Sequence, residues 1–148
     1  MVKEFDAKAV EIRYVTAADK PFWYTLDKHL CEAEFGRKIR DKRGYVISID
    51  DKPIGVMRYN LFWDITPFLT LIYIADAYQN KGYGKQAMLF WENEMHELGY
   101  KMVMTSTQVD EQAQHFYRKL GYKDRGSIFL DGTPFEQPQE MIMIKVLT

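Results

Sequence analysis

A glycine-bearing loop in the middle of the chain holds the most specific arrangement of chemical groups in the sequence. Gln79, Gly82 and Gly84 lie between a strongly apolar stretch and an amphipathic stretch. Two glycines at a strand-to-helix junction let a ligand approach the backbone, because no Cβ stands in the way. The first N–H groups of the helix favour an anion, and Lys81 and Lys85 add positive charge. The pattern predicts a diphosphate cradle; a loop whose glycines serve only a tight turn is the alternative.

Two other nucleotide-binding loops fit the sequence poorly. A Walker loop needs Gly, four residues and then Gly-Lys-Ser/Thr, and the sequence has no such run. A dinucleotide fingerprint needs a third glycine shortly after the second, but residues 85–87 read Lys-Gln-Ala.

The loop resembles the coenzyme A loop of the GNAT superfamily of N-acetyltransferases, which reads Gln/Arg-x-x-Gly-x-Gly/Ala after an apolar strand. A second motif of that family is Asn-x-x-Ala, then Phe/Leu-Tyr, then Lys-x-Gly-Phe/Tyr. Its positions here are Asp110, Ala113, Phe116, Tyr117, Lys119, Gly121 and Tyr122. Asp110 replaces the usual Asn, and Asp76 stands where the family often has a proline. The resemblance covers about residues 10–146 and implies the GNAT fold.

This resemblance implies that the chain binds acetyl-CoA, the acyl donor. Backbone N–H groups of the loop would contact the diphosphate, and the preceding strand would bond the pantetheine arm. A bulge in that strand would present an N–H to the acetyl carbonyl, with Tyr73 or Ile74 at the matching position. The implied acetyl-CoA residues are Ile72, Tyr73, Ile74, Gln79, Asn80, Lys81, Gly82, Tyr83, Gly84, Lys85, Asp110, Ala113 and Phe116.

Tyr117 matches the family's general-acid tyrosine. Phenols and thiols have ordinary pKa values of about 10 and about 8.5, so a tyrosine can protonate the departing thiolate. A lone tyrosine on an apolar stripe usually packs in a core, but the register of the motif favours the catalytic role.

The acceptor side is expected at residues 61–68, because a hairpin connection is normally polar and this one is aromatic. Trp63 is predicted to border the acceptor pocket, and Asp64 to attract or deprotonate the amine through ionic contact beside the ring. The alternatives are an exposed Asp64 beside the second subunit of a homodimer, and ordered water as the base. Glu32 and Glu34 are further candidates for the base.

Thr107 and Gln108 lie at the carboxyl end of the fifth predicted strand, beside the splay of the parallel pair. Hydrogen-bonding side chains at the carboxyl end of a strand suit a substrate pocket. The alternative is a polar loop that caps the next helix.

The elements that must position these groups follow a recognisable order. Strands are predicted at residues 10–15, 45–49, 54–62, 68–75, 101–107, 122–130 and 139–147, and helices from Pro21 to about Leu30 and at 31–42, 83–98 and 111–120. Thr16 and Asp19 form a predicted capping box, and Asp110 a predicted N-cap. The continuous apolar run 68–75 indicates a strand covered on both faces, parallel to 101–107 after a helical crossover.

Composition narrows the class of protein. The 148 residues predict one domain over residues 1–148, and 20 Lys and Arg against 21 Asp and Glu disfavour a nucleic-acid partner. No apolar run approaches a membrane span, and the charged first eight residues do not resemble a secretory signal. The single cysteine, Cys31, excludes an internal disulfide, so the reducing cytoplasm is the expected compartment. The histidines have no ligand-spaced partner, so no metal site is predicted.

These observations predict a mixed α/β fold of the GNAT type. A central sheet of about seven strands, with a splayed parallel pair at strands four and five, is flanked by about four helices. The predicted function is acetyl-CoA-dependent N-acetyl transfer to a primary amine by direct attack in a ternary complex. The alternative is a non-catalytic acyl-CoA-binding module of the same fold. The acceptor stays open among polyamines, amino acids, aminoglycosides and protein amines.

Overall fold

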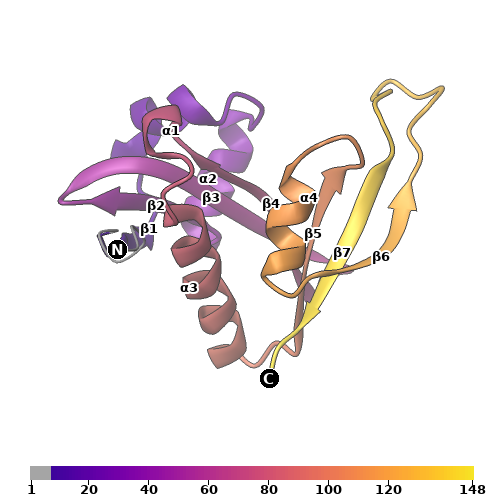
Figure 1. Cartoon of the computed structure of the whole chain (residues 1–148). Helices are drawn as coiled ribbons and strands as arrows, with labels where there is room; N and C mark the ends of the chain where they lie inside the picture. The colour runs from indigo at the N-terminus through magenta and orange to yellow at the C-terminus, as the bar shows by residue number, and fades with distance from the viewer. Residues whose placement is uncertain (1–7) are drawn as a thin grey trace. The chain divides into compact units, whose positions relative to one another are not determined.

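The computed structural model describes residues 8–148 (Figure 1). Its elements are β1 (Glu11–Tyr14), α1 (Lys20–Leu26), α2 (Glu32–Asp41), β2 (Gly44–Ile49), β3 (Lys52–Phe62), β4 (Thr66–Ile74), α3 (Tyr83–Glu97), β5 (Met102–Gln108), α4 (Ala113–Lys119), β6 (Lys123–Ile128) and β7 (Glu140–Val146). Short 3₁₀ turns, η2 (Ala17–Asp19) and η3 (Asp76–Tyr78), precede α1 and the glycine loop. Among these residues, none of the helices combines the length and the apolar character that a bilayer crossing requires.

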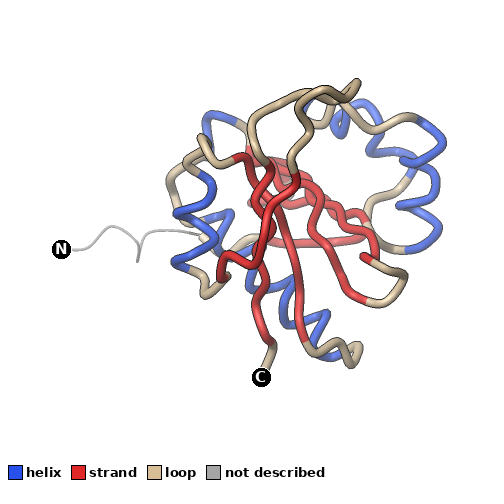
Figure 2. The backbone as a smooth tube through the Cα atoms, turned by 90° about the vertical axis from the view of Figure 1, so that its right-hand side faces the viewer, coloured by secondary structure: helices blue, strands red, loops and turns tan. Residues whose placement is uncertain are grey.

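The seven strands of the described chain form a mixed sheet in the order β1-β2-β3-β4-β5-β7-β6, seen as red tubes in Figure 2. β4 and β5 are parallel, whereas β1–β2, β2–β3, β5–β7 and β6–β7 are antiparallel. The parallel pairing joins Phe68 to Met104 and Leu69 to Thr105. This topology, with its four α-helices and its parallel fourth and fifth strands, confirms the predicted fold class.

The residues group into two compact units. The first comprises the chain up to Asn60 together with Thr70–Asn93, and the second comprises Leu61–Leu69 and Glu94–Thr148. The expectation of a single domain therefore stays a prediction.

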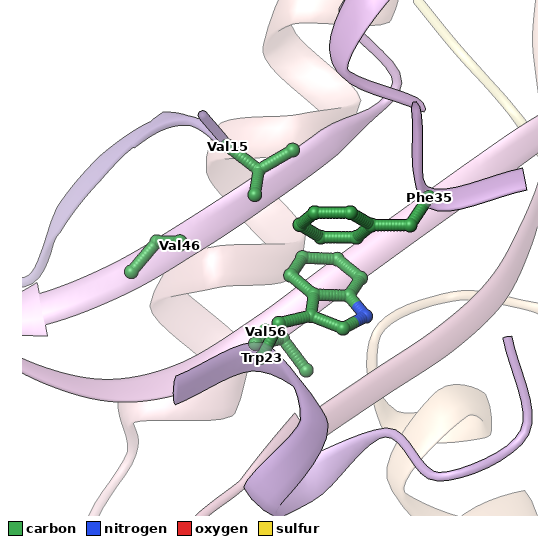
Figure 3. Packing of buried hydrophobic residues seen from close by; sticks show 5 residues of the cluster. All are labelled: Val15, Trp23, Phe35, Val46 and Val56. Carbon is green, nitrogen blue, oxygen red and sulfur yellow. The ribbon is translucent and has the colours of Figure 1, made fainter. Parts of the chain in front are cut away.

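The core of the first unit lies where α1 and α2 cover the sheet (Figure 3). Trp23 of α1 and Phe35 of α2 pack at a tilt of 59° with their ring centroids 5.5 Å apart, and Val15, Val46 of β2 and Val56 of β3 complete the cluster. Because Trp23 is fully buried, it contributes a large share of the apolar area that holds α1 to the sheet.

The predicted capping box at the start of the first helical segment is confirmed. The Thr16 N–H donates to Asp19 Oδ2 at 2.8 Å, and the Arg13 guanidinium binds both carboxylate oxygens of Asp19 at 2.7 Å. The hydrogen bond from Arg13, together with the one from the Thr16 N–H, lowers the pKa of Asp19 to about 2, against the opposing effect of burial.

The first helix ends at Leu26, earlier than the predicted Leu30, because Asp27 leaves helical geometry and turns its carboxylate inward. That carboxylate is fully buried and accepts hydrogen bonds from Trp23 Nε1 at 3.1 Å and Arg58 Nε at 2.7 Å. Buried charges require such partners, so this ion pair fixes where the chain leaves α1.

The prediction that β4 is covered on both faces is wrong. Leu69 and Ile74 are buried, but Thr70 and Tyr73 are exposed and Ile72 is half-buried. A run of apolar residue types therefore marks this strand without showing how many faces are covered.

Candidate functional site

The glycine loop of the first unit has the backbone geometry of an anion cradle. Asn80 and Gly82 take left-handed φ values of 62° and 88°, and α3 begins at Tyr83, as predicted. The Gly82 carbonyl accepts a hydrogen bond from the Gln86 N–H at 3.2 Å. The N–H groups of the first helical turn have no carbonyl of their own helix to bond, so they are available to an anion.

Space and charge around this loop also suit an anion. A Cβ placed on Gly82 would meet no atom within 4 Å, so the backbone there faces open space. Lys81 and Lys85 are exposed on either side of Gly82. A diphosphate can therefore approach the backbone closely and find positive charge beside it.

Gln79 ties the loop to the end of β4. Its Nε2 donates to the Ile74 carbonyl at 2.8 Å and to Asp76 Oδ1 at 3.2 Å. The side chain of Gln79 therefore has a structural role, and its backbone N–H also donates to the Asp76 carbonyl at 3.3 Å. Tyr73, also implied in acyl-donor binding, is partly exposed beside this junction.

In the second unit, Tyr117 is buried, with the rings of Phe116 and Tyr122 at centroid distances of 5.3 and 5.7 Å. Burial raises the pKa of Tyr117, a hydrogen bond with the Thr105 side chain opposes this, and the negative charge of Glu111 raises it further. The phenol therefore keeps its proton at neutral pH, as a general acid must.

Thr105 connects this tyrosine to the parallel strands. Its side chain is almost fully buried, and its hydroxyl donates to the Leu69 carbonyl at 3.0 Å. Leu69 and Thr105 are also partners in the parallel pairing of β4 with β5. The polar contact of Tyr117 thus lies beside the parallel strands.

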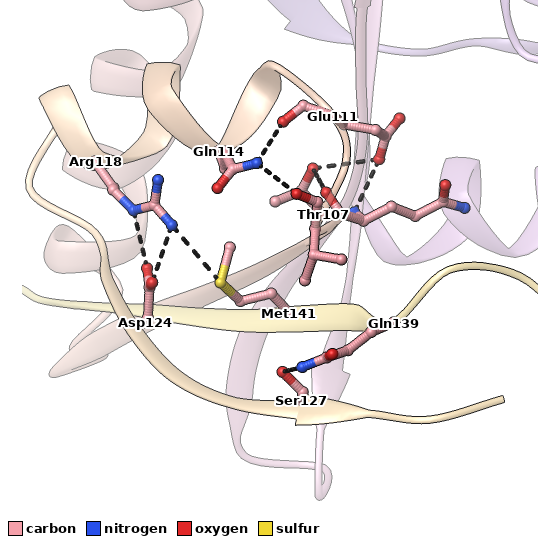
Figure 4. A network of polar contacts seen from close by, with 10 residues as sticks. Thr107, Glu111, Gln114, Arg118, Asp124, Ser127, Gln139 and Met141 are labelled. Carbon is pink, nitrogen blue, oxygen red and sulfur yellow. Dashed lines mark hydrogen bonds and ion pairs between the residues drawn. The ribbon is translucent and has the colours of Figure 1, made fainter.

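The segment before α4 corrects one prediction. Asp110 is not an N-cap, because α4 begins at Ala113 behind Gln112, which makes no side-chain cap. Instead, Glu111 Oε1 accepts hydrogen bonds from the Gln108 N–H at 2.8 Å and from the Thr107 hydroxyl at 3.2 Å (Figure 4). Our sequence reasoning missed Glu111, although a glutamate three residues after the residue whose N–H it accepts is the spacing of a capping box.

The side chains of Thr107 and Gln108 are engaged in different contacts. Thr107 is buried and bonded to Glu111, whereas Gln108 Nε2 donates to Gln137 Oε1 at 3.0 Å. Of the other residues implied on α4, Ala113 is exposed and Phe116 is half-buried. These four positions remain candidates for ligand contact.

Trp63 and Asp64 form the turn of the β3–β4 hairpin. Both have left-handed φ values, 55° and 63°, and the Ile65 N–H donates to the Phe62 carbonyl at 3.1 Å across the turn. Trp63 is 78% exposed, and its ring lies 4.6 Å from that of Phe62. The connection is therefore a tight turn, shorter than the stretch 63–67 that the predicted strands left between them, and it displays an aromatic ring and a carboxylate.

The two further candidates for the base have other partners. Glu32 forms an ion pair with Lys20, and Glu34 forms one with Arg37 on the same helix. Both pairs are exposed on the first unit.

A comparison with known protein families shows to which family this chain belongs. The model of the acetyltransferase (GNAT) family matches residues 9–122. The chain belongs to the GNAT family. Membership supports acyl-CoA-dependent N-acetyl transfer in general, and the family model spans both the glycine loop and Tyr117.

Solved structures share the fold across nearly the whole chain. The ribosomal-protein-S18-alanine N-acetyltransferase of Escherichia coli superposes with a TM-score of 0.78 at 16% identity, covering 94% of each chain. A GNAT acetyltransferase of Elizabethkingia anophelis with acetyl-CoA bound gives 0.72 at 17% identity, over 94% of this chain and 99% of that one. Arabidopsis thaliana Naa50, in complex with the bisubstrate analogue CoA-Ac-MVNAL, gives 0.76 at 13% identity, over 93% and 98%. No curated protein sequence matches the chain.

Proposed function

We propose that this GNAT protein is an acetyl-CoA-dependent N-acetyltransferase that acetylates a primary amine by direct attack in a ternary complex. The observation that carries the proposal is Tyr117, a buried tyrosine in the register of the family motif that has a hydrogen bond with the Thr105 side chain. A module that only binds acyl-CoA has no need of a proton donor there.

Acetyl-CoA would be held chiefly by backbone groups. The loop 79–84 and the first turn of α3 would bind the diphosphate, with Lys81 and Lys85 adding charge. Backbone groups of residues 72–74 at the end of β4 would bond the pantetheine arm, and an N–H of Tyr73 or Ile74 would polarise the acetyl carbonyl. Asp110, at the β5–α4 turn, is a further candidate for contact with the cofactor, as are Ala113 and Phe116 of α4.

The reaction forms a bond between the amine nitrogen and the acetyl carbon and breaks the thioester C–S bond. Tyr117 would give its proton to the departing thiolate, because the phenol is protonated at neutral pH and negative charge develops on the sulfur as the C–S bond breaks. The amine nitrogen must lose a proton to a base or to water.

The acceptor is a primary amine whose identity the comparisons leave open. The Escherichia coli neighbour is named for an alanine of a ribosomal protein, so a free polypeptide N-terminus belongs among the amines to be tested. We therefore place a peptide with an N-terminal alanine beside a peptide with an internal lysine, alanine amide, spermidine and kanamycin.

A thiol-release assay with acetyl-CoA and this panel tests the proposal. We expect amine-dependent release of coenzyme A with at least one acceptor, and mass spectrometry should find that amine heavier by one acetyl group. Tight binding of acetyl-CoA with no transfer to any amine would instead favour the non-catalytic module.

A further inference from the structure

Strand β5 presents different residues on its two faces. Thr105 pairs with Met143 of β7, and Thr107 pairs with Met141, and all four side chains are buried. Since side chains alternate along a strand, the residues between them point to the other face.

The face with Thr105 and Thr107 is the one that α4 covers. Thr107 bonds to Glu111 just before α4, the Thr105 side chain bonds to Tyr117, and Arg118 Nη2 lies 3.8 Å from Met141 Sδ (Figure 4). The proton donor proposed for the thiolate therefore lies on this face.

The opposite face of the same strand carries a polar pair. The Ser106 hydroxyl donates to Glu140 Oε2 at 2.6 Å, and Glu140 is the cross-strand partner of Gln108. Ser106 and Glu140 are half-buried. In the described part of the chain, Ser106 is the one side chain with a hydrogen bond to the Glu140 carboxylate, and that bond is made by Oε2.

This pair also lies at a particular place along the strands. Ser106 is the residue after Thr105, which pairs with Leu69 of β4. A phenol contact on one face of β5 and a carboxylate contact on the other therefore belong to consecutive residues. This separation suits a direct attack, because the nucleophile approaches the carbonyl carbon from a different side than the one that the thiolate leaves by.

We propose that Glu140, held by Ser106, binds the ammonium group of the acceptor and takes a proton from its nitrogen, which frees the lone pair for attack. This role rests on the proposed function. In the balanced step, the ammonium nitrogen loses two protons: the first passes to the Glu140 carboxylate, the N–C bond then forms as the C–S bond breaks, the second nitrogen proton passes to water, and the Tyr117 phenol proton passes to the thiolate. Exchange with water afterwards restores both side chains.

Asp64 is the carboxylate that the sequence favoured for this role, and its surroundings differ from those of Glu140. It is exposed in a two-residue turn, whereas Glu140 is half-buried in a strand and oriented by a hydrogen bond from Ser106. A carboxylate that is oriented and partly shielded from water interacts more strongly with a cation than an exposed one does.

Steady-state kinetics on the full chain, with the panel amine that the wild type acetylates fastest, test this assignment. Glu140→Gln keeps an oxygen that can accept from Ser106 but removes the charge and the proton acceptor. We expect kcat/KM for the amine to fall about 100-fold or more, with the KM for acetyl-CoA unchanged, because general base catalysis supplies roughly 10²–10⁴-fold. The matched control is Glu136→Gln, which removes the same charge from an exposed position before β7 and should stay within about twofold of the wild type.

Each alternative has a distinct result. Wild-type kinetics in Glu140→Gln, with a large loss in Asp64→Asn, would return the base to the hairpin turn and overturn this assignment. If Glu140→Gln and Asp64→Asn both had wild-type kinetics, water would be the proton acceptor, and the assignment of Glu140 would again be overturned. Thermal melts check that the variants fold; if Glu140→Gln does not fold, Ser106→Ala and Glu140→Asp must each lower kcat/KM for the amine for the assignment to stand. If the wild-type chain acetylates no amine at all, the proposed function fails first, and this role fails with it.

Discussion

Replacing Gly82 by alanine tests the contribution of the loop backbone to acetyl-CoA affinity separately from its contribution to the stability of the fold. Gly82 has a φ of 88°, and a Cβ there would meet no atom within 4 Å. The substitution therefore adds left-handed backbone strain but no clash within the protein. The new methyl group would occupy the space through which a diphosphate must approach the loop.

The two costs have different sizes and are measured separately. A non-glycine residue in left-handed geometry costs about 1–2 kcal/mol, which lowers Tm by roughly 2–8 °C for a chain of this length. Loss of one or two hydrogen bonds to a charged group costs about 1.5–3 kcal/mol each, so the affinity for acetyl-CoA should fall at least about tenfold.

Calorimetric titration of acetyl-CoA into Gly82→Ala and a matched control measures the difference. The control is Gly99→Ala at the other end of α3, where φ is 98° and a Cβ would also meet nothing within 4 Å. Both variants should show a similar drop in Tm, and only Gly82→Ala should lose affinity. Unchanged affinity in a folded Gly82→Ala protein would refute the cradle, and equal losses in both variants would show that destabilisation alone explains the effect.

Three further predictions concern single side chains. Tyr117→Phe should lower kcat by about 10²–10⁴-fold with little change in acetyl-CoA affinity, since the buried ring remains; wild-type turnover with chemistry rate-limiting would remove Tyr117 from the mechanism. Asp19, with its pKa lowered to about 2 beside Arg13, adds stability that is complete above its unfolded pKa of about 3.9 and is lost as pH falls toward 2. Urea denaturation of Asp19→Asn should therefore show a deficit of about 2 kcal/mol at pH 6 that disappears near pH 2, and a deficit independent of pH would contradict this linkage. Asp27→Asn leaves the buried Arg58 without its counter-charge and should lower the free energy of unfolding by about 3 kcal/mol or more in the same assay; a loss under 1 kcal/mol would show that the pair is dispensable.

Local sequence determined the features that depend on neighbouring residues. The capping box of Thr16 and Asp19, the start of α3 after Gly82 and its end before Gly99 are each visible in a few consecutive residues. Turn and cap geometry depends on the φ values that a residue tolerates and on hydrogen bonds three or four positions away. The order of elements and the parallel crossover follow from the same local patterns together with chain connectivity.

Features that depend on distant partners were decided only by the tertiary structure. Asp27 meets Arg58 across 31 positions, and Ser106 meets Glu140 across 34. Nothing near either residue in the sequence indicates its partner. For the same reason, the exposure of β4 could not be read from its apolar residues, because coverage depends on which elements pack against each face.

The candidate site divides in the same way. The turn at Gly82 and the start of α3 behind it were predictable, because glycine spacing encodes them directly. The division of β5 into a face with Tyr117 and a face with Glu140 was not, because strand register decides it, and a shift of one residue would exchange the faces. Residue types and spacing determined which chemistry this chain carries, and the pairing of β5 with β7 decided where the carboxylate beside that chemistry lies, because hydrogen-bond register sets the direction of every side chain on a strand.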